Sequence, residues 1–164
     1  MSEIVVAPVA WVHNIRRTTE DDDWGGLVSE IILDPSLPDE CLDGLETFSH
    51  AEIIFHFHLV EEDGIVFGAR HPRGNPAWPK VGIFAQRARL RPNRLGLSIV
   101  RILRREGRSL FVEGLDAVNR TPVLDIKPVM AEFLPRESIR QPDWSHELMI
   151  DYWNPSREDA NAEG

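Results

Sequence analysis

The sequence predicts an all-β fold, a small barrel or sandwich of about seven short strands with one or two short helices. Short segments rich in Val, Ile, Leu and Phe recur along the chain, and several alternate with polar residues as half-buried strands do. Clusters of Gly, Pro, Asn and Asp separate these segments, and helical periodicity is scarce. The 164 residues are enough for one domain with a hydrophobic core. We assign residues 1–153 to this domain and expect residues 154–164 to form a disordered C-terminal tail.

The expected strands follow one another with few helical interruptions. The clearest alternation lies in residues 51–60. Residues 95–103 and 110–115 form a predicted hairpin joined by the polar loop 104–109. The remaining strands are expected at residues 4–12, 27–33, 65–69, 81–85 and around 123–126.

Two short helices and one mobile loop complete the expected fold. Ser36 is suited to be the N-cap of a short helix that Gly44 ends. Residues 144–153 have the pattern of a second short helix. The polar segment 13–26 contains an acidic tract followed by Trp24 and two glycines. We expect a mobile loop there, in which Trp24 either caps the core or closes over a ligand.

The charged residues are distributed unevenly along the chain. The net charge is −9, but residues 1–63 hold 15 acidic and 2 basic residues, whereas residues 64–110 hold 11 basic and 1 acidic. Eight of these bases are arginines between Arg87 and Arg108. Arginine makes bidentate contacts with phosphates. Either the segments neutralise one another in the fold, or the arginines form a basic patch for a nucleic acid backbone.

Several kinds of catalytic site are absent from the sequence. It has no Gly-x-Ser-x-Gly elbow, no phosphate-binding P-loop and no dinucleotide-binding fingerprint, which excludes a conventional nucleotide-binding α/β domain. His56 and His58 lie two apart on a predicted strand, with Glu62 four residues later, as in the first metal motif of cupins. Because the second such motif is missing, we expect no catalytic metal and a packing role for His56.

The sequence also restricts the expected location of the protein. No apolar run is long enough to span a membrane, and the N-terminus lacks the pattern of a signal peptide. A single cysteine, Cys41, rules out an internal disulfide and fits a reducing compartment. We therefore expect a cytoplasmic protein without a membrane partner.

An ordered series of short motifs runs through most of the chain. In order they are Gly44-Leu-Glu46, Phe48-Ser-His50, Phe55-His-Phe-His58, Gly82-Ile-Phe-Ala-Gln-Arg87, Arg91-Pro-Asn93, Gly96-Leu-Ser98, Gly114-Leu-Asp116 and Thr121-Pro-Val-Leu-Asp-Ile-Lys-Pro128. The series resembles the TsaA-like β-barrel family, whose best-known members are the tRNA threonylcarbamoyladenosine methyltransferases. The resemblance favours the barrel over the sandwich. It implies an S-adenosylmethionine-dependent methyltransferase that acts on tRNA, with the arginines from Arg87 to Arg108 as the possible contact.

The resemblance also implies where the methyl donor would bind. By it, the donor site consists of Trp24, Gly25, His58, Leu59, Arg87 or Arg91, Ile99, Asp116, Ala117, Val118 and Asn119. Asn93 and Ser98 are the candidate catalytic residues, as groups that position the acceptor.

Chemistry supports a donor site in the same stretch. S-adenosylmethionine carries a sulfonium, a ribose diol, an adenine and an amino acid, so its site needs a carboxylate, backbone groups and an apolar wall. Asp116, the backbone of residues 115–119 and Arg87 could supply the polar part. Alternatively, Arg87 and Asp116, or Lys127 and Asp125, form ion pairs that only stabilise the fold.

Departures from the family pattern leave the acceptor open. Asn119-Arg120 stands where the family has Asp-Gly, Val129 stands where it has Tyr, and Arg94 stands where it has Pro. The alternatives to tRNA are a small molecule or peptide as acceptor, or a non-enzymatic cupin-like barrel that binds a metal or ligand. We also expect a homodimer, because the arginine-rich hairpin and the Trp24 loop are long for a monomer and members of the family pair.

Overall fold

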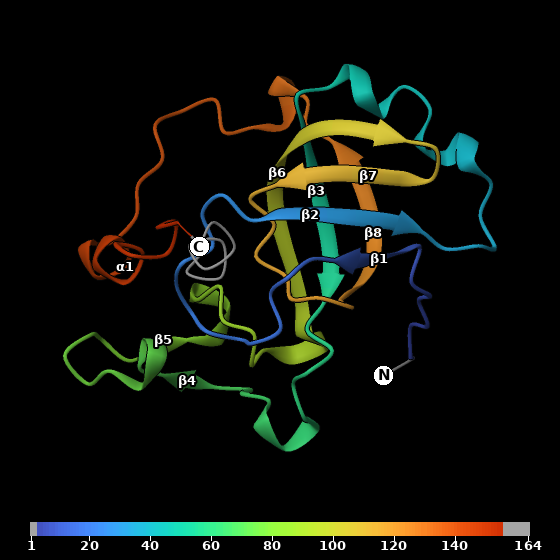
Figure 1. The fold of residues 1–164 in the computed structure, drawn as a ribbon. Helices are drawn as coiled ribbons and strands as arrows, with labels where there is room; N and C mark the ends of the chain where they lie inside the picture. Colours follow the sequence, from blue (N-terminus) through green and yellow to red (C-terminus); the bar gives the residue numbers. More distant parts are fainter. Residues whose placement is uncertain (1–2, 156–164) are drawn as a thin grey trace, which may run out of the picture.

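The computed structural model describes residues 3–155, which form a closed antiparallel β-barrel (Figure 1). Six strands close the barrel in the order β1-β2-β7-β6-β3-β8, and two short strands, β4 and β5, pair in a separate arm. The predicted mainly β fold, a single small barrel with few short helices, is thereby confirmed. The strands are β1 Ala10–His13, β2 Val28–Leu33, β3 His50–His56, β4 Ala69–Arg70, β5 Val81–Gly82, β6 Leu95–Glu106, β7 Ser109–Glu113 and β8 Pro122–Pro128.

Helical structure is limited to short connections. The α-helix α1 covers Asp143–Leu148. The 3₁₀ turns are Asp39–Leu42, Leu45–Thr47, Glu62–Gly64, Pro72–Gly74, Ile83–Ala85, Pro92–Arg94 and Ala131–Phe133. None of the helices formed by residues 3–155 has the length and apolar character needed to cross a lipid bilayer.

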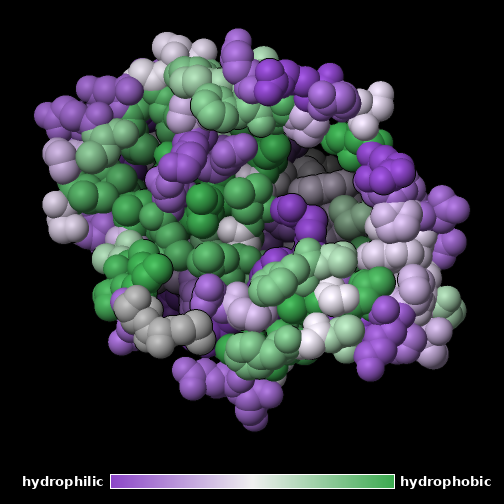
Figure 2. All heavy atoms as spheres, turned by 180° about the vertical axis from the view of Figure 1, so that it is seen from behind, coloured by the Kyte–Doolittle hydropathy of each residue, from purple (hydrophilic) through white to green (hydrophobic). Residues whose placement is uncertain are grey.

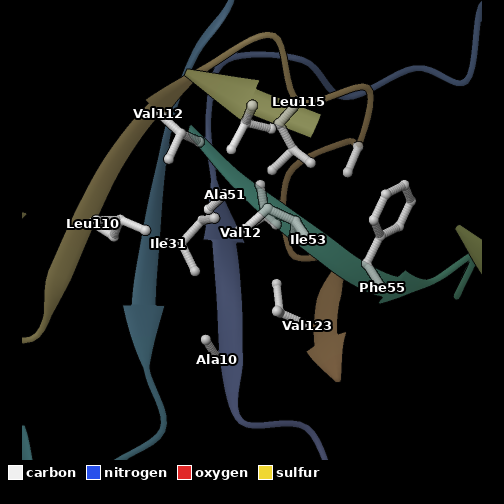
Figure 3. Packing of buried hydrophobic residues seen from close by; sticks show 12 residues of the cluster. Ala10, Val12, Ile31, Ala51, Ile53, Phe55, Leu110, Val112, Leu115 and Val123 are labelled. Carbon is white, nitrogen blue, oxygen red and sulfur yellow. The ribbon is translucent and has the colours of Figure 1, made fainter. Parts of the chain in front are cut away.

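The core fills the interior of the barrel, and along β1, β3 and β7 every second residue points inward (Figure 3). Strand β3 shows this alternation most clearly, with Ala51, Ile53 and Phe55 buried. On β6 the inward positions include Gly96, and a Cβ there would lie 2.4 Å from two ring atoms of Phe55. The Phe55 ring therefore packs directly on the backbone of β6.

Several expected strands begin or end elsewhere. Of the strand expected at residues 65–69 only Ala69 is strand, and of the one expected at 81–85 only Val81–Gly82 is, because β4 and β5 pair only briefly. Pairing at the N-terminus starts only at Ala10, while Ile4 and Val5, which composition assigned to the strand, are exposed. An apolar run forms a strand only where a neighbouring strand offers hydrogen bonds, and none pairs with these residues. Strand β3 ends at His56, since His58 lies in a turn closed by the Val60 amide, which donates to the Phe57 carbonyl.

The predicted polar loop 104–109 is mostly strand. Strand β6 continues to Glu106 and turns at Gly107, which has a positive φ of 57°. The Arg104 guanidinium stacks 3.7 Å from the centroid of the Phe111 ring, so the charged residue belongs to the outer face of the hairpin. Ser36 is not an N-cap, because its hydroxyl donates to Asp34 Oδ1 at 2.6 Å.

The C-terminal segment returns to the barrel after a fully exposed stretch, residues 131–143. Helix α1 ends at Leu148, earlier than the pattern indicated. Pro155 forms a parallel bridge with Gly25, so defined contacts reach two residues past the expected domain end. The rest of the predicted tail, residues 156–164, lies outside the described residues.

We predict that Gly96→Ala destabilises the protein by about 1–3 kcal/mol, because the new methyl group must displace the Phe55 ring from a packed interior. Urea unfolding measures the loss. Gly82→Ala is the matched control, since Gly82 lies in a strand with a negative φ and an added Cβ meets no atom within 4 Å. Equal stability of the two variants would contradict the prediction.

Candidate functional site

The barrel wall is incomplete between β6 and β7. The ladder between these strands runs from the pair Glu106 and Ser109 to the pair Arg101 and Glu113. Residues 95–100 of β6 extend further, where they pair with β3 on one side only. The chain leaves β7 at Gly114, with a positive φ of 86°, and crosses this part of the wall as an irregular segment up to β8. An edge of β6 therefore remains open to side chains and ligands.

Asp116 lies in this opening and accepts hydrogen bonds on both carboxylate oxygens. The Ser98 hydroxyl, on the inward face of β6, donates to Asp116 Oδ1. The Tyr152 hydroxyl, from the C-terminal segment, donates to Asp116 Oδ2. Three distant parts of the chain thus meet at one half-buried carboxylate.

Arg87 lies beside the same opening. Its guanidinium donates to the carbonyl of Leu97, on the part of β6 that has no partner in β7. Within residues 3–155, Arg87 and Asp116 form no ion pair, whereas Lys127 does pair with Asp125 on the barrel surface. Of the two structural ion pairs considered from the sequence, only the second one forms.

The charges around the opening are reflected in the pKa of Tyr152. Burial raises the pKa of its hydroxyl far above the usual value, the Asp116 carboxylate raises it further, and the Arg87 guanidinium opposes both. The Tyr152 hydroxyl therefore keeps its proton and acts as a donor. In the described part of the chain, no Lys or Arg forms an ion pair with Asp116.

An apolar wall stands next to the carboxylate. Trp24, Leu27 and Val118 are buried together, and the Tyr152 ring packs against them. The Arg16 guanidinium lies 3.9 Å from the centroid of the Trp24 ring. Of the two roles considered for Trp24, capping of a hydrophobic cluster is the one observed.

The segment 13–26, expected to be mobile, is held by two polar residues that the sequence did not single out. Arg16 is 2% exposed and donates to the carbonyls of Glu20, Asp22 and Asp23 at 2.7–3.1 Å. Asn14 donates to the Ala117 carbonyl and to Ser29 Oγ, both at 2.9 Å.

Asn14 also joins this segment to the one that carries Asp116. The backbone N–H of Asn14 donates to Asn119 Oδ1 at 3.1 Å, and the backbone N–H of Asn119 donates to the Arg16 carbonyl at 2.8 Å. Nothing in a single sequence distinguishes such bridging residues from ordinary loop residues, because their partners lie about a hundred positions away.

The histidine pair that resembles a cupin metal motif is not arranged as the sequence indicated. His58 lies in a turn after the end of β3, so it does not share a strand face with His56 as expected. Burial lowers the pKa of both imidazoles, and for His56 the Arg94 guanidinium and His58 lower it further. In residues 3–155, no group of three or more His, Cys, Asp and Glu side chains could hold a metal ion. The absence of a catalytic metal stays a prediction.

The remaining candidates form no hydrogen bond or ion pair with Asp116 within residues 3–155. Leu59 is exposed beside His58, and the adjacent Val60 carbonyl accepts from Arg94 at 2.8 Å. Arg91 donates to the Gln86 carbonyl at 3.0 Å. Asn93 is exposed at the start of β6, with a positive φ of 63°.

Three other candidates for the donor site, Ile99, Ala117 and Gly25, differ in which of their groups are accessible or already bonded. The Ile99 side chain points outward and is 46% exposed, so only its backbone lies along the open edge of β6. Ala117 is buried, and its carbonyl is bound to Asn14. The Gly25 amide donates to the Asn154 carbonyl. The structure thus brings Trp24, Ser98, Asp116 and Val118 to one place and leaves Asn93 and Leu59 at the surface.

The described residues fit the chemistry of S-adenosylmethionine. A carboxylate without a cationic partner suits a positively charged or hydroxyl-bearing ligand, and Arg87 suits its carboxylate. Trp24 and Val118 form a buried apolar support behind the Tyr152 ring, and the backbone edge of β6 offers hydrogen-bonding groups.

Known proteins have similar sequences and a similar fold. A family model described as the tRNA-methyltransferase O N-terminal domain matches residues 23–133. The chain is 41% identical over 101 residues to a probable S-adenosyl-L-methionine-binding protein of Pyrococcus abyssi, covering 62% of this chain and 52% of that one. It is 38% identical over 105 residues to a human tRNA (adenine(37)-N6)-methyltransferase, covering 64% of this chain and 23% of that one.

Two further comparisons extend the match. A probable S-adenosyl-L-methionine-binding protein of Methanothermobacter thermautotrophicus is 38% identical over 130 residues, which cover 77% of this chain and 90% of that one. A crystal structure of TrmO from Pseudomonas aeruginosa matches with a TM-score of 0.70 and 26% identity, over 88% of this chain and 62% of that one. The chain thus spans about half of the Pyrococcus relative and about a quarter of the human one. The match to the family model over residues 23–133 shows that this chain belongs to the family of tRNA-methyltransferase O N-terminal domains.

Proposed function

We propose that this protein is an S-adenosylmethionine-dependent methyltransferase that modifies the exocyclic nitrogen of an adenosine in tRNA, as the names of its relatives indicate for those proteins. The observation that carries the proposal is the Asp116 carboxylate, held by two hydroxyl groups at the opening of the barrel wall. The family resemblance assigns Asp116 to the donor site, and this arrangement supports that assignment.

Different residues around Asp116 would contact different parts of the methyl donor. Asp116 would accept hydrogen bonds from the ribose diol or the ammonium group, and Arg87 would bind the carboxylate of the donor. The buried side chains of Trp24 and Val118 would support the site from behind, through the Tyr152 ring. The backbone of Ile99 would contribute hydrogen-bonding groups along the rim. Gly25 and Asn119, whose backbone amides already bind the Asn154 and Arg16 carbonyls, would shape the rim. His58 and Leu59 would close the rim on the side of Arg94.

When bound, S-adenosylmethionine supplies a methyl group that its sulfonium has already activated. The protein therefore needs to hold the acceptor nitrogen in line with the methyl carbon, at about 3 Å, and to exclude water. Asn93 is exposed in the turn before β6 and is suited to position the acceptor. The Ser98 hydroxyl is bound to Asp116, so we assign it to orienting that carboxylate rather than to contacting the acceptor.

We predict that Asp116→Ala weakens S-adenosylmethionine binding at least about tenfold, or about 1.4 kcal/mol, because the ligand loses its charged partner. Isothermal titration calorimetry measures the affinity. Asp125→Ala is the matched control, since that aspartate pairs with Lys127 on the outer surface. Unchanged affinity in a folded Asp116→Ala variant would argue against the assigned site.

The structure divides the arginine run into two groups. Five of the eight form ion pairs with carboxylates: Arg89, Arg101, Arg104, Arg105 and Arg108. The other three, Arg87, Arg91 and Arg94, bind backbone carbonyls and form no ion pair within residues 3–155. The first group fits the interpretation that the charged segments neutralise one another, and the second group leaves three arginines for a nucleic acid. We therefore limit the proposed tRNA contact to Arg87, Arg91 and Arg94.

We predict that Arg94→Ala lowers the slope of log affinity for tRNA against log salt by up to about one unit, because one phosphate contact is lost. Fluorescence anisotropy at several salt concentrations measures it. Arg104→Ala is the control, since Arg104 already pairs with Glu106 at the far end of β6. A weak, salt-independent interaction in the wild type would instead favour a small molecule or peptide as the acceptor.

We also propose a homodimer. The outward side chains of Leu95, Leu97 and Ile99 on β6 are 41%, 39% and 46% exposed, and Figure 2 shows a broad hydrophobic area on the face opposite to that of Figure 1. Adjacent exposed apolar side chains of this kind are typical of surfaces that contact another protein. A second copy on this strand would border the opening that contains Asp116.

We predict a mass of twice the 18.7 kDa of one chain by light scattering at micromolar concentration. The mass of a single chain would contradict the dimer.

We also propose a cytoplasmic location. A tRNA substrate is consistent with this location, which the single cysteine of the sequence led us to expect.

A further inference from the structure

The C-terminal segment 143–155 lies outside the region that defines the family, yet it contacts the proposed donor site. It follows the exposed stretch 131–143 and then docks on the segment 13–26. The Trp24 amide donates to the Tyr152 carbonyl and the Gly25 amide donates to the Asn154 carbonyl, both at 2.8 Å. In Figure 1, α1 stands apart from the barrel, and the chain after it returns toward the barrel.

The docking is specific in its geometry. A Cβ on Gly25 would lie 2.2 Å from the Trp153 carbonyl oxygen and 2.8 Å from that of Asn154, so the segment fits against a residue without a side chain. A second anchor lies further out, where Trp78 Nε1 donates to Glu147 Oε2 at 2.8 Å. The C-terminal segment is therefore held in one position by specific contacts.

Docking places Tyr152 between the apolar wall and the carboxylate. Its ring packs against the buried cluster of Trp24, Leu27 and Val118, and its hydroxyl donates to Asp116 Oδ2. Ser98 occupies the other oxygen, so the carboxylate is held from two sides by neutral donors. Because both donors are uncharged, they fix the orientation of Asp116 and leave its negative charge available to a ligand.

We propose that Tyr152 is a positioning residue of the donor site, which holds the Asp116 carboxylate in the orientation that binds S-adenosylmethionine. This inference rests on the proposed function and extends the site beyond the barrel residues that the family shares. Preorganisation of this kind improves binding because the free protein does not have to order the carboxylate when the ligand arrives.

The test is Tyr152→Phe, which keeps the ring and removes only the hydroxyl. We expect about five- to tenfold weaker binding of S-adenosylmethionine by calorimetry, with the midpoint of thermal unfolding nearly unchanged. In an Asp116→Ala background the same substitution should have no further effect, because the group that it positions is gone. A purely structural role would reduce the affinity equally in both backgrounds.

Ser145→Ala is the matched control, since it removes another hydroxyl of the same segment, one that donates to the Pro142 carbonyl at 2.6 Å. It should bind the donor as the wild type does. Wild-type affinity of Tyr152→Phe, or an equal loss in the Asp116→Ala background, would overturn the inference while leaving the proposed function intact. Tighter binding would also overturn it, because Tyr152 would then cover the site instead of building it. A wild type that does not bind S-adenosylmethionine would overturn both.

Discussion

The early end of the ladder between β6 and β7 is the constraint on which the site depends. A closed barrel normally satisfies the backbone of every strand on both sides. Here β7 stops at Glu113, and residues 95–100 of β6 keep one unpaired edge. The irregular segment after Gly114 covers this edge with a side chain, Asp116, in place of a strand. The same local failure of pairing provides both a polar group and free backbone groups for a ligand.

A carboxylate in such a place has to be stabilised without losing its charge. An arginine in direct contact would neutralise it and turn the site into a structural ion pair. Hydroxyl donors from Ser98 and Tyr152 compensate the partial burial of Asp116 and preserve its charge. Arg87 stays near enough to influence Tyr152, but it binds the Leu97 carbonyl. The arrangement keeps two opposite charges separate, as a zwitterionic ligand requires.

The alternation of apolar and polar residues predicted the strand segments that are paired on both sides and packed on the core. It failed at the exposed ends of strands. Ile53 and Phe55 face the core and could be placed from sequence. The outer half of the hairpin could not, since Arg104 and Glu106 lie in a strand while their side chains face solvent and pair with each other. Ile4 and Val5 led to the opposite error, because hydrophobicity alone does not provide a pairing partner.

The candidate site shows the same division between local and distant information. Trp24 and Asp116 could be proposed because they lie within short motifs or beside glycines. Tyr152 could not, because its role depends on a contact with a residue 36 positions earlier and on the missing side chain of Gly25. The two glycines after Trp24 suggested flexibility, yet the first of them admits the backbone of the C-terminal segment. Gly25, expected to lie in a mobile loop, is here part of a docking surface, and only the position of the partner segment distinguishes the two roles.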